Sequence, residues 1–176
     1  MLSLCESMPD KSYYCLATLA YQKRAVSRNT KDNKGRLEED SMEIVLTKPT
    51  AKDYVDLRIR SGMGEKDLSR SQRALDKSLF TASIYQDDLL IAFGRVVGDE
   101  GITFVVSDIM VDRAYWRQGY GDHIMSAIDD YLEEFTYEDS FVTLIARTPA
   151  DKIYLKYNFV YVDETRHGMQ RKQKKK

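Results

Sequence analysis

A buried strand that runs into a glycine-rich turn and then a helix is the strongest constraint in this sequence. Residues 105–111 are rich in β-branched and apolar side chains, which favours a buried strand. A polar turn follows at residues 112–118. Gly119 and Gly121 then open a segment whose apolar residues recur at helical spacing, namely Ile124, Met125, Ile128 and Leu132.

This arrangement indicates a site for a phosphate or pyrophosphate group. The first N–H groups of a helix have no acceptor within the helix, and the helix dipole adds partial positive charge there. Glycine also lets a ligand approach the backbone closely, because it has no Cβ atom. The alternative is a plain strand–loop–helix connection with turn glycines, since two glycines with one residue between them are a weak signal.

The rest of the sequence alternates between strand and helix patterns. Strands are expected at residues 42–47, 79–85, 89–97, 102–111, 141–146 and 159–162. Helices are expected at residues 50–60, 69–77, 119–134 and 149–157. This order predicts an α/β domain in which helices cover both faces of a mixed sheet.

Composition divides the chain into three parts. Residues 1–41 include a strongly charged stretch at 23–40 and little that could bury a core, so we expect a poorly structured extension there. Residues 42–170 are expected to form one domain, and residues 171–176 a basic tail that is a solvated end rather than a binding patch.

Charge and cysteine content exclude several classes of protein. The formal net charge of −1 does not favour a nucleic-acid partner. No apolar run is long enough to span a membrane, and no secretory signal is recognisable. Both cysteines, Cys5 and Cys15, lie in the extension, which argues against a disulfide framework in the domain and favours a cytoplasmic setting.

The glycine turn resembles the acetyl-CoA-binding motif of the GNAT superfamily of N-acyltransferases. That motif reads Gln/Arg-x-x-Gly-x-Gly/Ala at the start of a helix, and Gly119 and Gly121 match its two small positions. Trp116 stands at the first position, which is a departure. The neighbouring Arg117 and Gln118 are candidates for the missing polar contact.

A second stretch, residues 150–159, resembles a later element of the same family. The family pattern is Ala-x-x-Leu/Phe-Tyr-x-x-x-Gly-Phe. The residues that match it are Ala150, Ile153, Tyr154 and Phe159. Asn158 replaces the usual glycine, and asparagine tolerates left-handed backbone angles well. Arg147 stands where many members carry asparagine. The resemblance covers roughly residues 42–169.

The resemblance implies a GNAT-like, mixed and mostly antiparallel sheet with helices on both faces. It also implies acetyl transfer from acetyl-CoA, as co-substrate and without a metal, to an amine that attacks directly in a ternary complex. A small-molecule amine is the first choice of acceptor, and a protein lysine or N-terminus is the second. A homodimer is left open. A non-catalytic module that binds acetyl-CoA is the alternative from another class.

Specific residues follow from the resemblance. The coenzyme is expected on the backbone of the strand and turn, at Ile109, Met110, Val111, Arg117, Gln118, Gly119, Tyr120, Gly121 and Asp122. Tyr154 matches the family tyrosine that hydrogen-bonds or protonates the coenzyme sulfur, and Tyr157 is the fallback. A phenol with its ordinary pKa near 10 is protonated at neutral pH and can donate.

Other candidates come from the residues themselves. Asp108 is a carboxylate in an otherwise apolar strand, and it is a candidate general base. The alternative is a buried carboxylate paired with Arg95. His123 and His167 are weaker candidates. The resemblance also implies that residues 58–67 wall the acceptor site. Gly62 and Gly64 predict a mobile loop there, and Arg58 and Arg60 are candidates for binding an acidic group of the substrate.

Overall fold

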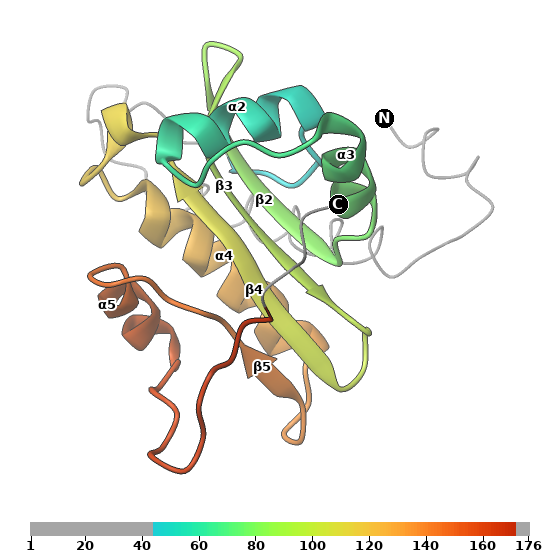
Figure 1. The fold of residues 1–176 in the computed structure, drawn as a ribbon, viewed down its shortest axis with the longest axis vertical. Coiled ribbons are helices and arrows are strands. Elements are labelled where there is room, and N and C mark those ends of the chain that lie inside the picture. Colours follow the sequence, from blue (N-terminus) through green and yellow to red (C-terminus); the bar gives the residue numbers. More distant parts are fainter. Residues whose placement is uncertain (1–43, 172–176) are drawn as a thin grey trace, which may run out of the picture.

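A five-stranded sheet with helices on both faces forms the body of the protein (Figure 1). The computed structural model describes residues 44–171. The strands follow chain order across the sheet: β1 (Ile44–Val45), β2 (Phe80–Gln86), β3 (Leu89–Gly98), β4 (Thr103–Val111) and β5 (Phe141–Thr143). The first four are antiparallel neighbours, whereas β5 runs parallel to β4. The predicted fold class is therefore confirmed.

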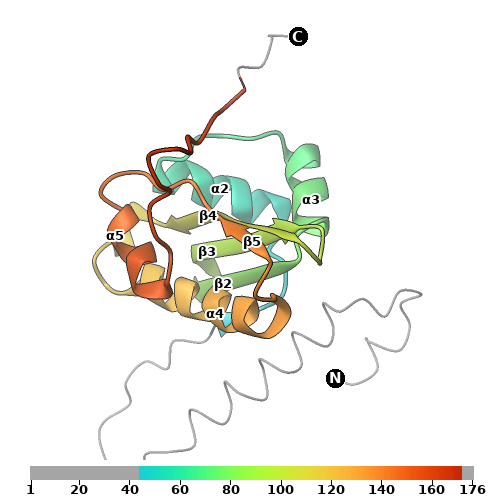
Figure 2. The ribbon, with the colours of Figure 1, turned by 90° about the horizontal axis from the view of Figure 1, so that it is seen from below.

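The helices lie in two layers (Figure 2). Helices α2 (Ala51–Ser61) and α3 (Leu68–Asp76) cover one face, and α4 (Tyr120–Phe135) covers the other. The short α5 (Asp151–Tyr154) and the 3₁₀ turn η3 (Leu155–Tyr157) lie beside α4. Thr50 and Asp67 cap α2 and α3 by accepting a hydrogen bond from a first-turn N–H, as their residue types favour.

Two apolar clusters fill the space between these layers. One lies between the sheet and α4 and includes Phe104, Ile124 and Ile128, which are fully buried. The other lies under α2 and α3 and includes Leu57, Phe93 and Met110. Strand β4 contributes to both clusters through Phe104 and Met110. These two residues are six positions apart and would share a face in a regular strand, so the alternation of side chains must be interrupted between them.

The middle of β4 carries a bulge. The β3–β4 register shifts between Phe93, which faces Met110, and Arg95, which faces Ser107. One residue more lies on β4 than on β3 between these pairs, and Asp108 has a left-handed φ of 54°. A bulge of this kind bends the strand and changes where its side chains point.

Strands β4 and β5 separate before the bulge. Their ladder ends at the pair Val105 and Thr143, although β4 continues to Val111. The turn η2 (Arg113–Tyr115) and the glycine turn then lead into α4. This separation creates the space in which the candidate site lies.

Three predicted elements differ from the structure. The strand expected at residues 141–146 ends at Thr143, because the chain leaves β4 there. The helix expected at 149–157 is only α5 followed by η3, and it ends where Asn158 adopts a left-handed φ of 59°. No strand forms at residues 159–162, which pair with no sheet edge and expose Val160, Tyr161 and Val162.

The predicted extension at residues 1–41 lies outside the described residues, as does the basic tail apart from Arg171. The division into these parts stays a prediction. Between residues 44 and 171, no helix combines the length and apolar character needed to cross a membrane.

Candidate functional site

A cavity of about 920 Å³ opens where β4 and β5 separate. Its walls come from residues 106–111 of β4, the turn that leads into α4, and a segment from Leu144 to Lys156. The end of α2 closes another side through Ser61, Gly62 and Met63. Tyr154, Asp108 and the residues predicted to bind the coenzyme all line this cavity, except Gln118, whose amide donates to the carbonyl of Ala114 at 3.4 Å.

The first backbone N–H groups of α4 have no hydrogen-bond acceptor within the helix or from a capping side chain. Gly119 is the N-cap with φ 89°, and no side chain caps the helix. The N–H groups of Asp122 and His123 both bond to the Gly119 carbonyl, so the N–H groups before them have no acceptor within the helix. A Cβ on Gly121 would meet Ile153 at 3.4 Å, an ordinary van der Waals contact, so α5 packs directly on the first turn of α4. The turn has the features of an anion site.

The charges around the cavity are mostly positive. The basic lining residues are Arg113, Arg117, Arg147, Lys152 and Lys156. Lys156 pairs with Asp122 at 3.0 Å, while the other four form no ion pair within residues 44–171. The two carboxylates of the lining, Asp108 and Asp122, are both paired. This balance favours a ligand with several negative charges.

Asp108 is held by three donors. Its Oδ1 accepts from the Arg58 Nη1 at 2.7 Å, and its Oδ2 accepts from the Arg95 Nε at 2.7 Å and the Tyr54 hydroxyl at 2.8 Å. Burial raises the pKa of Asp108, but Arg95, Tyr54 and Arg58 outweigh burial and leave the pKa below its ordinary value. A carboxylate stabilised in its charged form is a weak base. The contacts therefore do not favour the base role and match the alternative, pairing with Arg95.

The two candidate tyrosines differ in their partners. The Tyr157 hydroxyl donates to the backbone carbonyl of Asp122 at 2.8 Å, and burial with nearby carboxylates raises its pKa to about 12. The Tyr154 hydroxyl forms no hydrogen bond with another residue in the described part of the chain, and burial raises its pKa. Tyr154 is therefore protonated at neutral pH and free to donate to a ligand.

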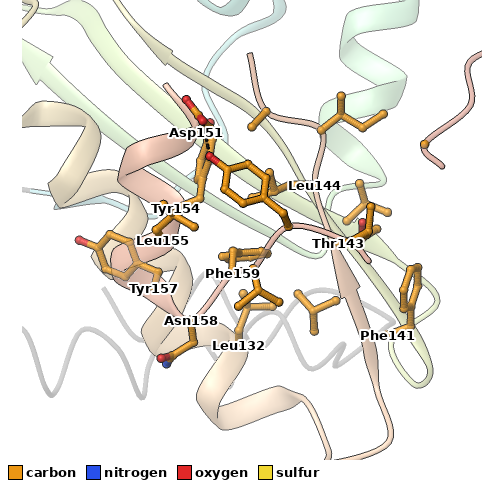
Figure 3. Close-up of a pocket in the computed structure, with 18 of the residues that line it drawn as sticks. Leu132, Phe141, Thr143, Leu144, Asp151, Tyr154, Leu155, Tyr157, Asn158 and Phe159 are labelled. Atoms are coloured by element: carbon orange, nitrogen blue, oxygen red, sulfur yellow. Dashed lines mark hydrogen bonds between the residues drawn. The ribbon is translucent and has the colours of Figure 1, made fainter. Parts of the chain in front are cut away.

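Tyr154 also lies between two cavities. A second cavity, of about 1170 Å³, is bounded by β5, α5 and the chain after Asn158 (Figure 3). Tyr154, Leu144 and Thr148 line both spaces. Tyr157 also lines the second cavity, and its hydroxyl group is directed toward the start of α4, where it donates to the carbonyl of Asp122 (Figure 3). The short helix α5 thus forms the wall that separates the two cavities.

The arginines and histidines singled out in the sequence lie elsewhere. Arg58 is buried against Asp108, and Arg60 bonds to Asp112 at 2.6 Å, so neither is available for an acidic ligand group. His123 and His167 are exposed and line neither cavity. Residues 44–171 hold no group of three or more His, Cys, Asp or Glu side chains that could hold a metal ion.

Two features of the site could not be read from the sequence. The Trp116 indole N–H donates to the carbonyl of Val111 at 2.8 Å, and the Arg113 guanidinium lies 5.8 Å from the indole centre. Tyr54 contacts Asp108 across 54 positions of sequence. The departure at Trp116 was visible in the sequence, but its partners depend on how the turn folds back on β4.

Comparisons with known proteins agree with this geometry. The family described as "Acetyltransferase (GNAT) domain" matches residues 60–169. A solved structure from methicillin-resistant Staphylococcus aureus, described as a protein of unknown function and probable acetyltransferase, is 39% identical with a TM-score of 0.71. The match covers 75% of this chain and 99% of that chain.

Two further proteins are similar to this chain, one over a shorter stretch and the other at a lower identity. An uncharacterized ycf52-like N-acetyltransferase of Prochlorococcus marinus is 32% identical over 71 residues, and the match spans 38% of this chain and 39% of that curated relative. The structure of AAC(6')-Iy in complex with a bisubstrate analogue of coenzyme A is 15% identical with a TM-score of 0.57, covering 76% of this chain and 99% of that one. At that identity the likeness shows the fold alone. The family match extends over most of the chain, and the chain therefore belongs to the GNAT acetyltransferase family.

Proposed function

We propose that this chain transfers an acetyl group from acetyl-CoA to the amine of a small molecule, by direct attack of the amine in a ternary complex. The observation that carries this proposal is the uncapped start of α4, which opens into the cavity between β4 and β5. Backbone N–H groups and basic side chains that form no ion pair within residues 44–171 line one cavity, and this combination suits a pyrophosphate-bearing coenzyme.

The chain would bind acetyl-CoA along two surfaces. The turn from Arg117 to Asp122 would hold the pyrophosphate, and the β4 backbone at residues 109–111 would hold the arm that carries the acetyl group. The latter surface is free for a ligand because β5 leaves β4 after Thr143. Gln118 would contribute only through its backbone, since its side chain bonds to Ala114.

In this reaction the protein has to hold the amine next to the thioester and to supply one proton to the leaving thiol. Acetyl-CoA supplies the acetyl group as a thioester, whose carbonyl carbon the neutral amine attacks with release of the thiol. Tyr154 would supply the proton for that thiol, because its hydroxyl is protonated and has no partner among the described residues. Asp108 would not act as the base, and water would take the proton lost by the amine.

Two alternatives remain as proposals. A protein lysine or N-terminus would need a groove that accepts a peptide at the α2 side of the cavity. A module that binds acetyl-CoA without turnover is favoured by one observation, since Trp116 replaces the usual polar residue and bonds to the β4 carbonyl of Val111. The cytoplasmic setting and the homodimer stay predictions.

One assay separates these three readings. The full chain is incubated with acetyl-CoA and a panel of small amines, lysine peptides and peptides with free N-termini, and thiol release is measured. We expect release that depends on a small amine. Release with peptides alone would favour the second reading, and tight acetyl-CoA binding without any release would favour the third.

A further inference from the structure

The bulge in β4 is held in place by a buried charge cluster. Asp108 has a φ of 54°, a left-handed region that is uncommon for residues other than glycine, although Asp tolerates it better than most. The surroundings here are two guanidinium groups and a phenol. The side chains of Arg58, Asp108 and Arg95 keep 7%, 10% and 14% of their exposure, so little water competes for these contacts.

The three donors come from different parts of the fold. Tyr54 and Arg58 belong to α2, one helical turn apart, and Arg95 belongs to β3. Arg95 also donates to the carbonyl of Ala74 at 3.0 Å and to the hydroxyl of Ser78 at 3.2 Å, at the end of α3. Asp108 therefore joins α2, α3 and β3 to a single point of β4.

Arg58 extends this cluster to the loop after α2. Its Nε donates to the carbonyl of Gly64 at 3.1 Å, and its Nη2 donates to the carbonyl of Met63 at 3.1 Å. Gly62 and Gly64 have left-handed φ values of 85° and 79°. The loop that the sequence suggested was mobile is thus bonded at two successive carbonyls to the same side chain that holds Asp108.

Both segments joined by Arg58 line the cavity. Met63 lies in its wall at the end of α2, and residues 108–111 lie in its wall on β4. In the proposed reaction, which this inference takes as its basis, the β4 wall would hold the acetyl-bearing arm and the α2 wall would face the acceptor. Apolar side chains of similar volume usually stabilise a fold at least as well as a buried ion pair does. The presence of the Arg58–Asp108 pair therefore needs an explanation other than stability.

We propose that Arg58 and Asp108 are positioning residues: they fix the β4 bulge and the acceptor-side loop at residues 62–64 relative to each other, so that amine and thioester meet in one geometry. Transfer between two bound reactants depends steeply on this geometry, and a displacement of about 1 Å can cost about a hundredfold in rate. The cluster acts through the walls of the cavity and not by taking a proton.

The test uses the full chain and the variant Asp108→Asn. Asparagine tolerates a left-handed φ and keeps the shape of the side chain, but it removes the charge. We expect kcat for acetyl transfer to fall about a hundredfold while the affinity for acetyl-CoA, measured by calorimetry, stays nearly unchanged. The loss should persist at high pH, where the amine is already neutral. Recovery of kcat at high pH would identify a general base and overturn the proposal.

A matched control is Asp112→Asn. Asp112 is also a buried carboxylate that pairs with an arginine of α2, Arg60, at 2.6 Å, but this pair touches neither the bulge nor residues 62–64. We expect Asp112→Asn to lower thermal stability with much less effect on kcat. Equal losses of kcat in the two variants would show that the Asp108 effect is only structural.

A second readout does not depend on turnover. Hydrogen–deuterium exchange should be faster in Asp108→Asn both at residues 107–111 and at residues 62–64, because Arg58 bonds to Asp108 and also to the carbonyls of Met63 and Gly64. The variant Arg58→Lys keeps the charge but replaces the three donor nitrogens of the guanidinium with one, so it should speed exchange in both segments even if Asp108→Asn does not fold. Unchanged exchange at residues 62–64 in the folded variants would overturn the coupling. Absence of thiol release by the parent protein would instead refute the proposed function.

Discussion

Two tyrosines that lie close together in the sequence differ in the hydrogen bonding of their hydroxyl groups. Tyr154 and Tyr157 both belong to the segment of α5 and η3, and both have a raised pKa. The Tyr157 hydroxyl is already bonded to the start of α4, whereas the Tyr154 hydroxyl has no hydrogen-bond partner within residues 44–171. Of these two hydroxyl groups, therefore, only that of Tyr154 is free to donate to a ligand.

Tyr154→Phe tests this assignment. If Tyr154 protonates the leaving thiol, the variant should lose about a hundredfold in turnover and keep its affinity for acetyl-CoA. A loss of about tenfold would still fit a positioning role, since water can donate in its place. In the parent protein, turnover should not fall on the alkaline side until the pH exceeds 10.0, because the pKa of Tyr154 is raised from that value.

Tyr157→Phe is the control. It removes the hydrogen bond to Asp122 and should lower stability more than turnover. Turnover in Tyr154→Phe that equals the parent across the pH range, with every accepted amine, would reduce Tyr154 to a packing residue.

The partners of Asp108 show which contacts of the site could be predicted from the sequence and which could not. A carboxylate within an apolar strand was an anomaly visible in the sequence, and pairing with Arg95 was expected as an alternative because β3 and β4 are neighbours in a hairpin. Arg58 and Tyr54 could not be predicted. Their contacts depend on how α2 lies on the sheet, across 50 and 54 positions of sequence.

Close packing of α4 on the sheet depends on a glycine in β3. A Cβ at Gly94 would lie 2.5 Å from Ile124, 2.7 Å from Ile109 and 2.9 Å from Ile128. Real Cβ atoms do not come this close, so these three isoleucine side chains, or the elements that carry them, would have to shift. Gly94 lies opposite the bulged part of β4. A larger side chain at position 94 would therefore disturb the geometry of the site.

Gly94→Ala should therefore destabilise the protein by about 1–3 kcal/mol, the usual range for overpacking a core. Chemical denaturation measures this, with Gly101→Ala as the control, because a Cβ at Gly101 would meet nothing closer than 4.0 Å. A stability for Gly94→Ala equal to that of the control would mean that α4 packs less closely than described.

Elements with a strong local pattern were predictable, and those that depend on a neighbour were not. The strand, glycine turn and helix from β4 to α4 follow from apolar spacing and from Gly119 and Gly121. The strand expected at residues 159–162 had a suitable composition, but a strand also needs an edge to pair with. The bulge at Asp108 gave no signal, because one extra residue in a ladder is visible only when both strands are paired.

The charge of the molecule as a whole conceals the charge of its site. The formal net charge is −1, yet the cavity is lined by basic residues, most of them without an ion pair in the described part. Near-neutral composition argued against nucleic acid, but it could not indicate a local site for a polyanion. That indication came from the turn alone.

The stability of the whole protein should depend on Asp108 in acid. Its pKa is lowered in the folded protein from the ordinary 3.8. A carboxyl of this kind contributes its full stabilisation above its unfolded-state pKa and loses it as the pH falls through the folded-state pKa. Removing one partner of a buried ion pair costs about 3–5 kcal/mol, so Asp108→Asn should be less stable than the parent by about that amount at pH 7.

The difference between parent and variant should shrink below about pH 3.8, because a protonated Asp108 resembles asparagine. Urea denaturation between neutral pH and pH 3 measures it. A difference that stays constant over this range would show that the charge of Asp108 is not what stabilises the fold.

Binding of acetyl-CoA to the glycine turn is the most direct test of the account. Calorimetric titration would compare the parent with Gly119→Glu, which places a carboxylate where the pyrophosphate is proposed to bind. Gly119→Ala introduces the same strain at φ 89° without charge, and a Cβ there would meet only His123, at 3.8 Å. Gly101→Glu adds the same charge at the opposite end of β4. We predict that Gly119→Glu abolishes binding, Gly119→Ala weakens it and Gly101→Glu leaves it unchanged. A folded Gly119→Glu variant that binds acetyl-CoA as tightly as the parent would contradict the account.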